Sequence, residues 1–196
     1  IFTGDWHPTF SERIALAKLA KGDFNGAIAI YRGLASNDVA RGQAVDRRIV
    51  LLHQMNYAKT KDHRGLETAL IEQRKQYAVE ESKQEAMITF LHREHKKLVA
   101  GMIGKAKPAD KGAIGKAIMV TDVYAGMEDN AAEKEWAHSS IADLYVMQKA
   151  WGKAVPLYVE LEQTYPQSKN ATSYVRKAIA AQAEWTGWPK EISWSA

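Results

Sequence analysis

The segment His92-Arg93-Glu94-His95-Lys96-Lys97 holds residue types that commonly bind metal ions. On a helix, His92 and His95 lie three positions apart and share one face, so two imidazoles could reach one ion. The spacing differs from the H-E-x-x-H pattern of zinc enzymes, however, and it places no third ligand. Lys96 and Lys97 also raise the local positive potential, which disfavours a cation. A solvated polar helix face is the favoured interpretation, and no metal site is predicted.

Two glycine-lysine segments resemble parts of a phosphate-binding loop: Gly101-Met-Ile-Gly104-Lys105 and Gly112-Ala-Ile-Gly115-Lys116. A P-loop needs four residues between its glycines and a Ser or Thr after its lysine, which holds Mg²⁺. Here two residues separate the glycines and Ala follows each lysine, so nucleotide hydrolysis is rejected. The favoured interpretation is a flexible basic loop that contains Lys105, Lys107 and Lys111, with weak anion binding left open.

His138, Ser139 and Asp143 are the residue types of a hydrolytic triad. All three fall on one predicted helix, where adjacent residues point in different directions. A triad requires side chains from separate elements to converge on one point, so this group is rejected as a catalytic site. The sequence therefore predicts no catalytic residue, no cofactor and no enzymatic activity.

Charge and composition limit the classes of partner. The chain has 196 residues, no Cys and a formal net charge of +4, and residues 41–116 carry 16 Lys or Arg and 9 Asp or Glu. Because acids interleave with bases and no Arg-aromatic alternation appears, nucleic-acid binding is not favoured. No apolar run is long enough to span a bilayer. The start at Ile1 and the absence of Cys slightly favour export over the cytoplasm, and the compartment otherwise stays open.

Helices must position these residues, because apolar residues recur at helical spacing along nearly the whole chain. Thr9 and Glu12 have the spacing of a capping box, and no segment alternates like a strand. The predicted helices span residues 10–20, 24–34, 39–58, 63–78, 80–101, 111–126, 131–148, 151–164 and 170–186.

One spacing occurs twice. Ala15 is followed by an aromatic residue nine positions later (Phe24), by Ala27 at twelve and by Tyr31 at sixteen, and Ala142, Trp151, Ala154 and Tyr158 repeat the series. Small residues let two antiparallel helices approach closely, so Ala should meet Ala across each hairpin. The repetition therefore predicts two equivalent helical hairpins.

The second copy resembles the tetratricopeptide repeat family, on the residues Ile141-Ala142-x-x-Tyr145, Ala154-x-x-x-Tyr158 and Pro166. His138 stands where the family prefers Trp. In the first copy, Lys18 and Val39 replace an aromatic residue and a proline. The specific resemblance covers about a third of the chain, and the closing residues 165–168 are similar to those of bacterial envelope proteins in this family.

The resemblance implies an all-α fold, a right-handed α-solenoid of about four helical hairpins plus a C-terminal capping helix. We expect a single domain over residues 1–196. The clearest repeats would be 8–38 and 135–168, with a divergent middle over 39–130 and a cap and aromatic tail over 170–196.

The resemblance also implies a non-enzymatic interaction scaffold, or an accessory subunit of a larger assembly, that binds another protein or a peptide in its concave groove. The groove would be lined by the first helix of each hairpin. The expected residues are Trp136, Ser139, Asp143 and Met147 in the best-matched hairpin, Thr9, Glu12, Leu16 and Ala20 in the first, and Arg48, Leu51, Met55 and Lys59 in the second. A purely structural core role for Leu16, Leu51 and Met55 is an equal alternative.

The C-terminal aromatic residues support a second hypothesis. Gly187 and Pro189 should end the last helix after Trp185, so Trp188 and Trp194 would lie in a tail. These two residues either fold back onto the cap or contact another chain, because Trp is enriched at binding hot spots. The alternative function is a structural subunit docked through this tail and the outer helix faces, with no peptide in the groove.

Overall fold

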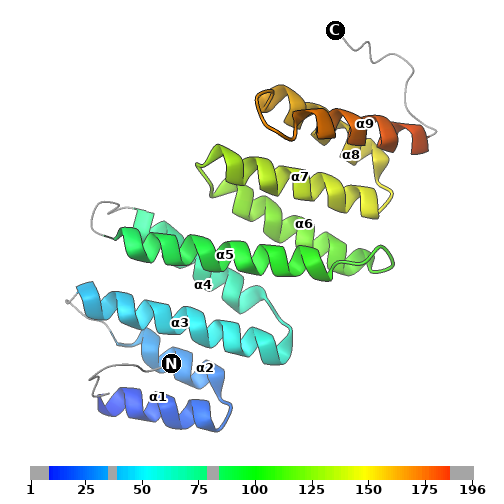
Figure 1. Cartoon of the computed structure of the whole chain (residues 1–196). Coiled ribbons are helices and arrows are strands. Elements are labelled where there is room, and N and C mark those ends of the chain that lie inside the picture. The colour runs from blue at the N-terminus through cyan, green and yellow to red at the C-terminus, as the bar shows by residue number, and fades with distance from the viewer. Residues whose placement is uncertain (1–8, 35–38, 79–83, 186–196) are drawn as a thin grey trace. The chain divides into compact units, whose positions relative to one another are not determined.

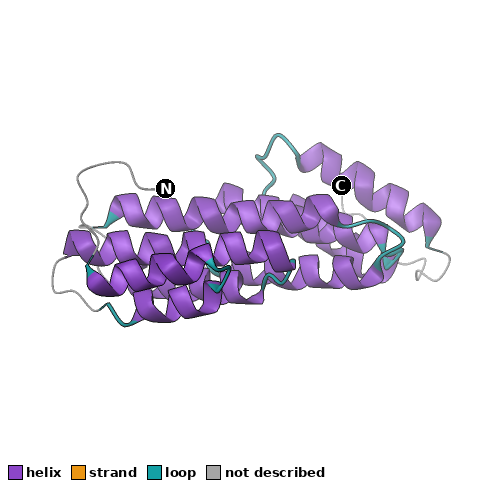
Figure 2. Ribbon diagram, turned by 90° about the horizontal axis from the view of Figure 1, so that it is seen from below, coloured by secondary structure: helices purple, strands orange, loops and turns teal. Residues whose placement is uncertain are grey.

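The computed structural model describes residues 9–34, 39–78 and 84–185. Over these ranges the chain forms only helices, turns and loops, which confirms the all-α class (Figure 1; Figure 2). The helices are α1 (Phe10–Ala20), α2 (Phe24–Arg32), α3 (Val39–Thr60), α4 (Arg64–Ala78), α5 (Glu85–Lys105), α6 (Lys111–Gly126), α7 (Ala131–Met147), α8 (Trp151–Thr164) and α9 (Ala171–Glu184). Their bounds lie within two residues of the predicted ones except in α5.

Helix α5 continues to Lys105, so the predicted end at residue 101 is wrong. A glycine inside a helix costs about 1 kcal/mol relative to alanine, which made Gly101 and Gly104 look like a break. Burial of apolar side chains offsets this cost, because Met102 and Ile103 pack against the cluster formed by Ala106, Ile114, Ala117 and Leu144. The predicted basic loop is therefore short, with Lys105 and Lys111 inside helices and Lys107 between them.

The capping box at the start of α1 is confirmed. Glu12 Oε2 accepts hydrogen bonds from the Thr9 backbone N–H at 2.7 Å and from Thr9 Oγ1 at 3.0 Å. Thr9 Oγ1 in turn accepts from the Glu12 N–H at 3.4 Å. Two backbone donors at the helix start are thereby satisfied, which fixes where α1 begins.

The chain divides into two compact units, Ile1–His95 and Lys96–Ala196, with the division inside α5. The expected single domain over residues 1–196 stays a prediction. In the described part of the chain, no helix is both long and apolar enough to cross a bilayer.

In the first unit, α2 packs against α1 and α3, and α3 against α4. Ala15, Ala27 and Tyr31 belong to one buried cluster, and both alanines have no exposed surface. Close approach of α1 and α2 at this Ala pair is the packing that the sequence spacing predicts.

In the second unit, the chain repeats that arrangement with α7, α8 and α9 (Figure 1). Ala142, Ala154 and Tyr158 lie in one buried cluster with Tyr174, Ala178 and Ala181 of α9. Trp185 follows α9 and lies against the start of α8, because a Cβ added at Gly152 would be 3.1 Å from its ring. Helix α9 therefore covers the apolar face of α8.

Odd-numbered helices also contact one another directly within each unit. Arg48 Nη1 of α3 lies 3.8 Å from Glu12 Oε1 of α1. Lys96 Nζ of α5 donates to Glu133 of α7 at 2.7 Å, and Lys177 Nζ of α9 donates to Asp143 of α7 at 2.7 Å. These contacts connect neighbouring odd helices of a unit across the even helix that separates them in sequence.

Candidate functional site

Trp136 is the first of the four α7 residues expected to line a groove, and it packs within the protein. Its ring meets the Tyr124 ring edge to face, with centroids 5.8 Å apart and planes at 89°. Lys96 Nζ lies 5.0 Å from the centroid of its ring, within cation–π range. The half-buried indole thus joins α7 to α5 and α6, so replacing it would disturb packing as well as any surface.

The remaining three α7 residues do not share one open surface. Ser139 Oγ donates to the Trp136 carbonyl at 3.0 Å, and Met147 packs against the cluster around Ile114. Asp143 is exposed; it accepts hydrogen bonds from the Tyr158 hydroxyl and from Lys177 Nζ. Of the predicted stripe, Asp143 lines a groove between helices.

That groove, called here the α7–α9 groove, has a volume of about 260 Å³. Its walls are α7 and α9, and its floor is α8. The lining side chains are Asp143, Val146, Trp151, Tyr158, Lys177, Ala180, Ala181 and Glu184. Burial, reinforced by the hydrogen bond to Asp143, raises the pKa of Tyr158 well above its usual value. The phenol therefore stays neutral and acts as a donor at the base of the groove.

A groove in the same register lies between α1 and α3, with Tyr31 of α2 beneath it. Leu16, Leu19 and Tyr31 correspond in spacing to Asp143, Val146 and Tyr158 of the α7–α9 groove. The α3 residues correspond equally well to those of α9: Arg48, Leu51, Leu52 and Met55 match Lys177, Ala180, Ala181 and Glu184. Seven positions therefore recur at both ends of the chain, which extends the repeat beyond its Ala and Tyr residues.

The two grooves differ in filling and in chemistry. Leu16, Leu51 and Met55 fill the α1–α3 groove to a volume of about 20 Å³, so their side chains contribute to packing there. Their counterparts Asp143, Ala180 and Glu184 are shorter or charged, and they leave the α7–α9 groove open. Of these two grooves in the described part of the chain, the C-terminal one is the larger cleft.

Three other predicted partner-binding residues are placed as follows. Glu12 is fully buried by its capping box and by Arg48, so a partner cannot reach it in the folded chain. Arg48 is largely covered and lines the α1–α3 groove. Lys59 is exposed, with its Nζ 5.5 Å from the centroid of the Phe24 ring. Trp188 and Trp194 lie outside the described residues.

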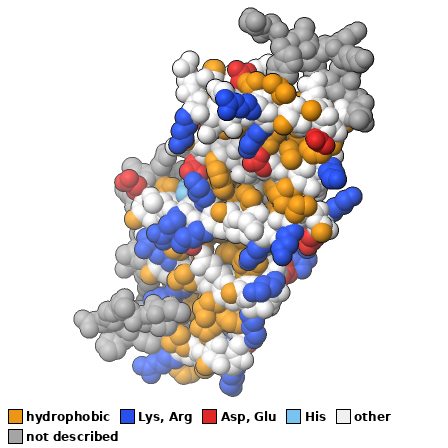
Figure 3. Space-filling model, turned by 45° about the vertical axis from the view of Figure 1, so that its right-hand side comes forward, with side chains coloured by type: hydrophobic (Ala, Val, Ile, Leu, Met, Phe, Trp, Pro, Cys, Tyr) orange, Lys and Arg blue, Asp and Glu red, His pale blue; other side chains and the backbone are white. Residues whose placement is uncertain are grey.

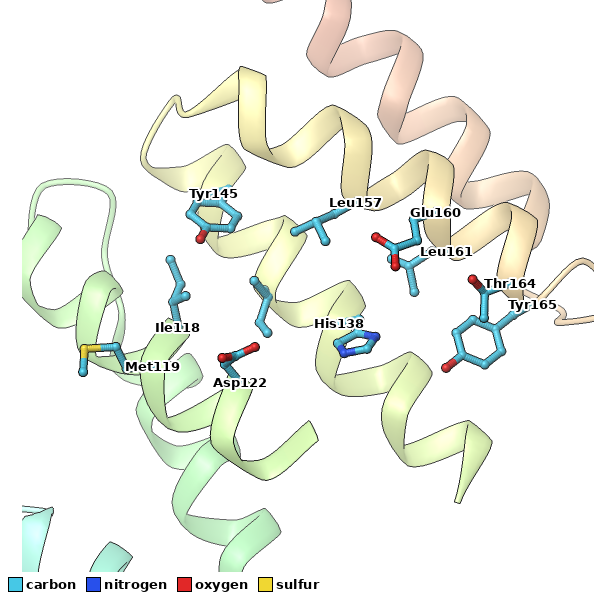
Figure 4. A pocket seen from close by; sticks show the side chains of 11 residues that line it. Ile118, Met119, Asp122, His138, Tyr145, Leu157, Glu160, Leu161, Thr164 and Tyr165 are labelled. Atoms are coloured by element: carbon cyan, nitrogen blue, oxygen red, sulfur yellow. The ribbon is translucent and has the colours of Figure 1, made fainter. Parts of the chain in front are cut away.

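Sequence reasoning missed a third groove, called here the α6–α8 groove, with a volume of about 360 Å³ (Figure 4). Its walls are α6 and α8 and its floor is α7. The lining residues are Ile118, Met119 and Asp122 of α6, His138, Ile141 and Tyr145 of α7, and Leu157, Glu160, Leu161, Thr164 and Tyr165 of α8 and its end. The sequence did contain one sign of this groove: His138, Ile141 and Tyr145 are spaced by three and four residues, which puts them on one face of α7.

Polar groups in the α6–α8 groove have few partners inside the protein. Asp122, His138 and Glu160 make no hydrogen bond or ion pair with the rest of the described chain. Figure 4 shows Asp122 and Glu160 coming from the two walls and His138 from the floor. Burial, with the Glu135 and Glu160 carboxylates, raises the pKa of Tyr165. The groove therefore combines an apolar lining with unpaired carboxylates.

His92 and His95, the candidate metal ligands of α5, contact an arginine within the protein. Arg74 Nη1 lies 3.1 Å from His95 Nδ1, and Arg74 Nη2 lies 3.1 Å from His92 Nε2. The guanidinium thus stands against both imidazoles, which disfavours a bound cation there. His95 is fully buried and Glu94 nearly so, and therefore the prediction of a solvated helix face is wrong. That prediction failed because side chains of other helices reach this face: Arg74 of α4 stands against both imidazoles, and Gln54 of α3 donates to Glu94.

The triad-type residues and the glycine-lysine segments form no catalytic or phosphate-binding arrangement in the described part of the chain. His138 lines the α6–α8 groove, whereas Ser139 bonds to Trp136 and Asp143 lines the α7–α9 groove, so the three do not converge. Gly101 and Gly104 lie in α5, and Gly112 and Gly115 lie in α6, so these glycines form no loop around a phosphate. Among the described side chains, no three His, Asp or Glu residues are grouped to hold a metal ion.

We compared the chain with protein-family models, with curated proteins and with solved structures, and none of them matches.

Proposed function

We propose that this chain is a protein-interaction scaffold or accessory subunit without enzymatic activity. In this proposal the helical hairpins form a right-handed solenoid of the tetratricopeptide repeat type, and the α7–α9 groove binds a segment of a partner protein. The observation that carries the proposal is the recurrence of seven groove positions at both ends of the chain. Recurring inter-helix surfaces are what repeat proteins use for binding.

The chemistry of the α7–α9 groove suits a peptide of mixed charge. Trp151 and Tyr158 supply aromatic surface, and rigid aromatic residues dominate binding hot spots. Lys177 and Glu184 of α9 place one charge of each sign along a single wall. The face drawn in Figure 3 likewise intersperses basic and acidic side chains with hydrophobic ones. A segment with apolar anchors and charges of both signs would complement this surface.

Site-specific photo-crosslinking in the cells that produce the protein tests this function. A benzophenone amino acid at Ala180 would face the groove, whereas the same group at Ile179 would project from an exposed position of α9 outside it. We expect one discrete adduct from position 180 and none from position 179. Equal yields from both positions, or no adduct from position 180, would contradict binding in this groove.

A charge change supplies the second arm of the experiment. Glu184→Lys reverses a charge on the exposed end of α9 without removing any hydrogen bond or ion pair described for the folded chain. We expect the position-180 adduct to fall several-fold in this variant while the helical content stays constant. An adduct that persists undiminished would mean that the partner does not read the charge of the groove.

A further inference from the structure

The α6–α8 groove and the α7–α9 groove use different sides of α7. His138, Ile141 and Tyr145 line the first, and Asp143 and Val146 line the second. Residues two positions apart on an α-helix point about 200° apart, so Ile141 and Asp143 face in nearly opposite directions. A ligand in one groove therefore does not compete for the other groove's side chains.

Apolar side chains form much of the lining of the α6–α8 groove. Ile118 and Ile141 contribute to it from α6 and α7, and Leu157 and Leu161 contribute from α8. On the α6 wall Met119 is 69% exposed, and Val123, one turn later and outside the lining, is 38% exposed. Methionine at a binding surface adapts to different apolar partners because its side chain is flexible. Covering this surface with an apolar segment would lower the free energy of the system, because apolar side chains would leave water.

The charges of the α6–α8 groove have one sign. Asp122 on one wall and Glu160 on the other face the cleft, and its lining includes no Lys or Arg from the described residues. Two other carboxylates of the second unit are neutralised by ion pairs: Asp143 pairs with Lys177, and Glu133 pairs with Lys96. Two unpaired carboxylates across a cleft with apolar walls concentrate negative potential in it.

We propose that the α6–α8 groove is a second binding site, and that its occupant is a segment of a partner protein carrying apolar side chains together with Lys or Arg. Apolar side chains would fill the cleft over Ile141 and Leu157. Cationic side chains would pair with Asp122 and Glu160, one on each wall. Nucleic acids and anionic lipids do not fit, because the same carboxylates repel phosphate. The volume falls within the range of clefts that bind ligands.

Fluorescence anisotropy with a defined probe tests the proposal on the full chain. The probe is a labelled synthetic peptide with Leu and Lys at helical spacing, and its control is the same peptide with every Lys replaced by Glu. We expect saturable binding of the Lys peptide and at least tenfold weaker binding of the Glu peptide. Equal affinity for both peptides, or no saturable binding of the Lys peptide, would overturn the proposal.

Matched variants locate the binding. Asp122→Asn with Glu160→Gln removes both groove carboxylates, whereas Asp129→Asn with Glu162→Gln removes two carboxylates that do not line the groove. Neither double variant removes a hydrogen bond or an ion pair that is described for the folded chain. We expect affinity to fall about tenfold in the first variant and less than about twofold in the second. Equal losses would mean that general attraction to an acidic protein explains the binding, and would overturn the site.

Two further outcomes would reassign the occupant. If deleting residues 187–196 strengthens peptide binding tenfold or more, the chain's own C-terminal segment occupies the groove and the proposal fails. If the full chain dimerises and Asp122→Asn with Glu160→Gln abolishes the dimer, a second copy is the occupant. Unchanged affinity after the deletion, with a monomeric chain, supports a separate partner. The site is independent of the α7–α9 groove, so a negative crosslinking result at Ala180 would leave it standing.

Discussion

Tyrosine hydroxyls donate to carboxylates on neighbouring helices at several places in this protein. Tyr77 donates to Asp46 at 2.6 Å, and Tyr174 donates to Glu135 at 2.6 Å. Tyr158 donates to Asp143, but its counterpart Tyr31 has a buried hydroxyl without a hydrogen bond to the described chain. The cause lies in one residue, because Leu16 occupies the position that corresponds to Asp143.

This difference makes Tyr31 and Tyr158 a matched pair for mutation. Tyr158→Phe removes a hydrogen bond to a charged group, so we expect the free energy of unfolding to fall by about 1–2 kcal/mol. Tyr31→Phe removes a buried hydroxyl that has no partner among the described residues, and we expect a change within about 0.5 kcal/mol or a small gain. Urea unfolding of both variants measures the two values. Equal losses would show that the phenol–carboxylate bond contributes nothing.

The candidate sites show what residue-level reasoning could predict. Asp143 follows Ala142 directly and lies in a groove, as its spacing indicates. The position of Glu12 fits two predictions, a groove-lining residue and the acidic member of a capping box. In the structure Glu12 forms the capping box and is fully buried. The α6–α8 groove escaped prediction because Asp122, His138 and Glu160 come from three helices and no short motif connects them.

At the scale of elements, the helices could be predicted because their signals are local. Capping residues such as Thr9 and Asp110 act within one turn, and the spacing of apolar residues reports the buried face. The end of α5 could not be predicted from local signals. It depends on tertiary packing of Met102 and Ile103, which a sequence window does not contain.

Helix α8 contains a residue that opposes its own structure. Pro156 lies inside the helix and is exposed, and it has no N–H to donate to the carbonyl of Gly152. Pro156→Ala restores that donor and removes the clash of the ring with the preceding turn. We expect the free energy of unfolding to rise by about 1–3 kcal/mol, because few contacts are lost at an exposed position.

The matched control for this change is Pro166→Ala, in the turn that follows α8. A proline outside a helix mainly restricts the unfolded chain, so we expect its replacement to leave stability unchanged or to lower it by less than about 1 kcal/mol. Urea unfolding of both variants compares the effects. A neutral or destabilising Pro156→Ala would mean that α8 requires a bend at this residue.

At the scale of the whole molecule, the chain is two compact units that use the same packing rules with different surface chemistry. The Ala and Tyr positions of the repeat are buried in both units. Groove residues vary freely between the copies, as Leu16 and Asp143 illustrate. The sequence pattern therefore predicts the stacking of helices, which burial enforces, and not the recognition surfaces, which burial leaves unconstrained.

Buried phenols in both units predict how stability responds to alkaline pH. The usual pKa of tyrosine is 10.0, and burial together with Glu135 raises the pKa of Tyr174 to about 12. Tyr77 and Tyr158 shift in the same direction because they are buried and donate to Asp46 and Asp143. Above pH 10 the unfolded chain releases protons that the folded chain still holds. Stability from these groups is thus complete below pH 10 and falls as the pH rises toward 12.

Comparison with Tyr174→Phe separates this effect from the deprotonation of lysines, which occurs in both proteins. At neutral pH the variant should be less stable, because it lacks the hydrogen bond to Glu135. Between about pH 10 and pH 12 the difference should shrink, since the intact chain loses a contribution that the variant never had. Urea unfolding across this range measures the difference, and tyrosinate absorbance follows ionisation of the folded protein. A difference that stays constant to pH 12 would show that Tyr174 ionises alike in the folded and unfolded chains.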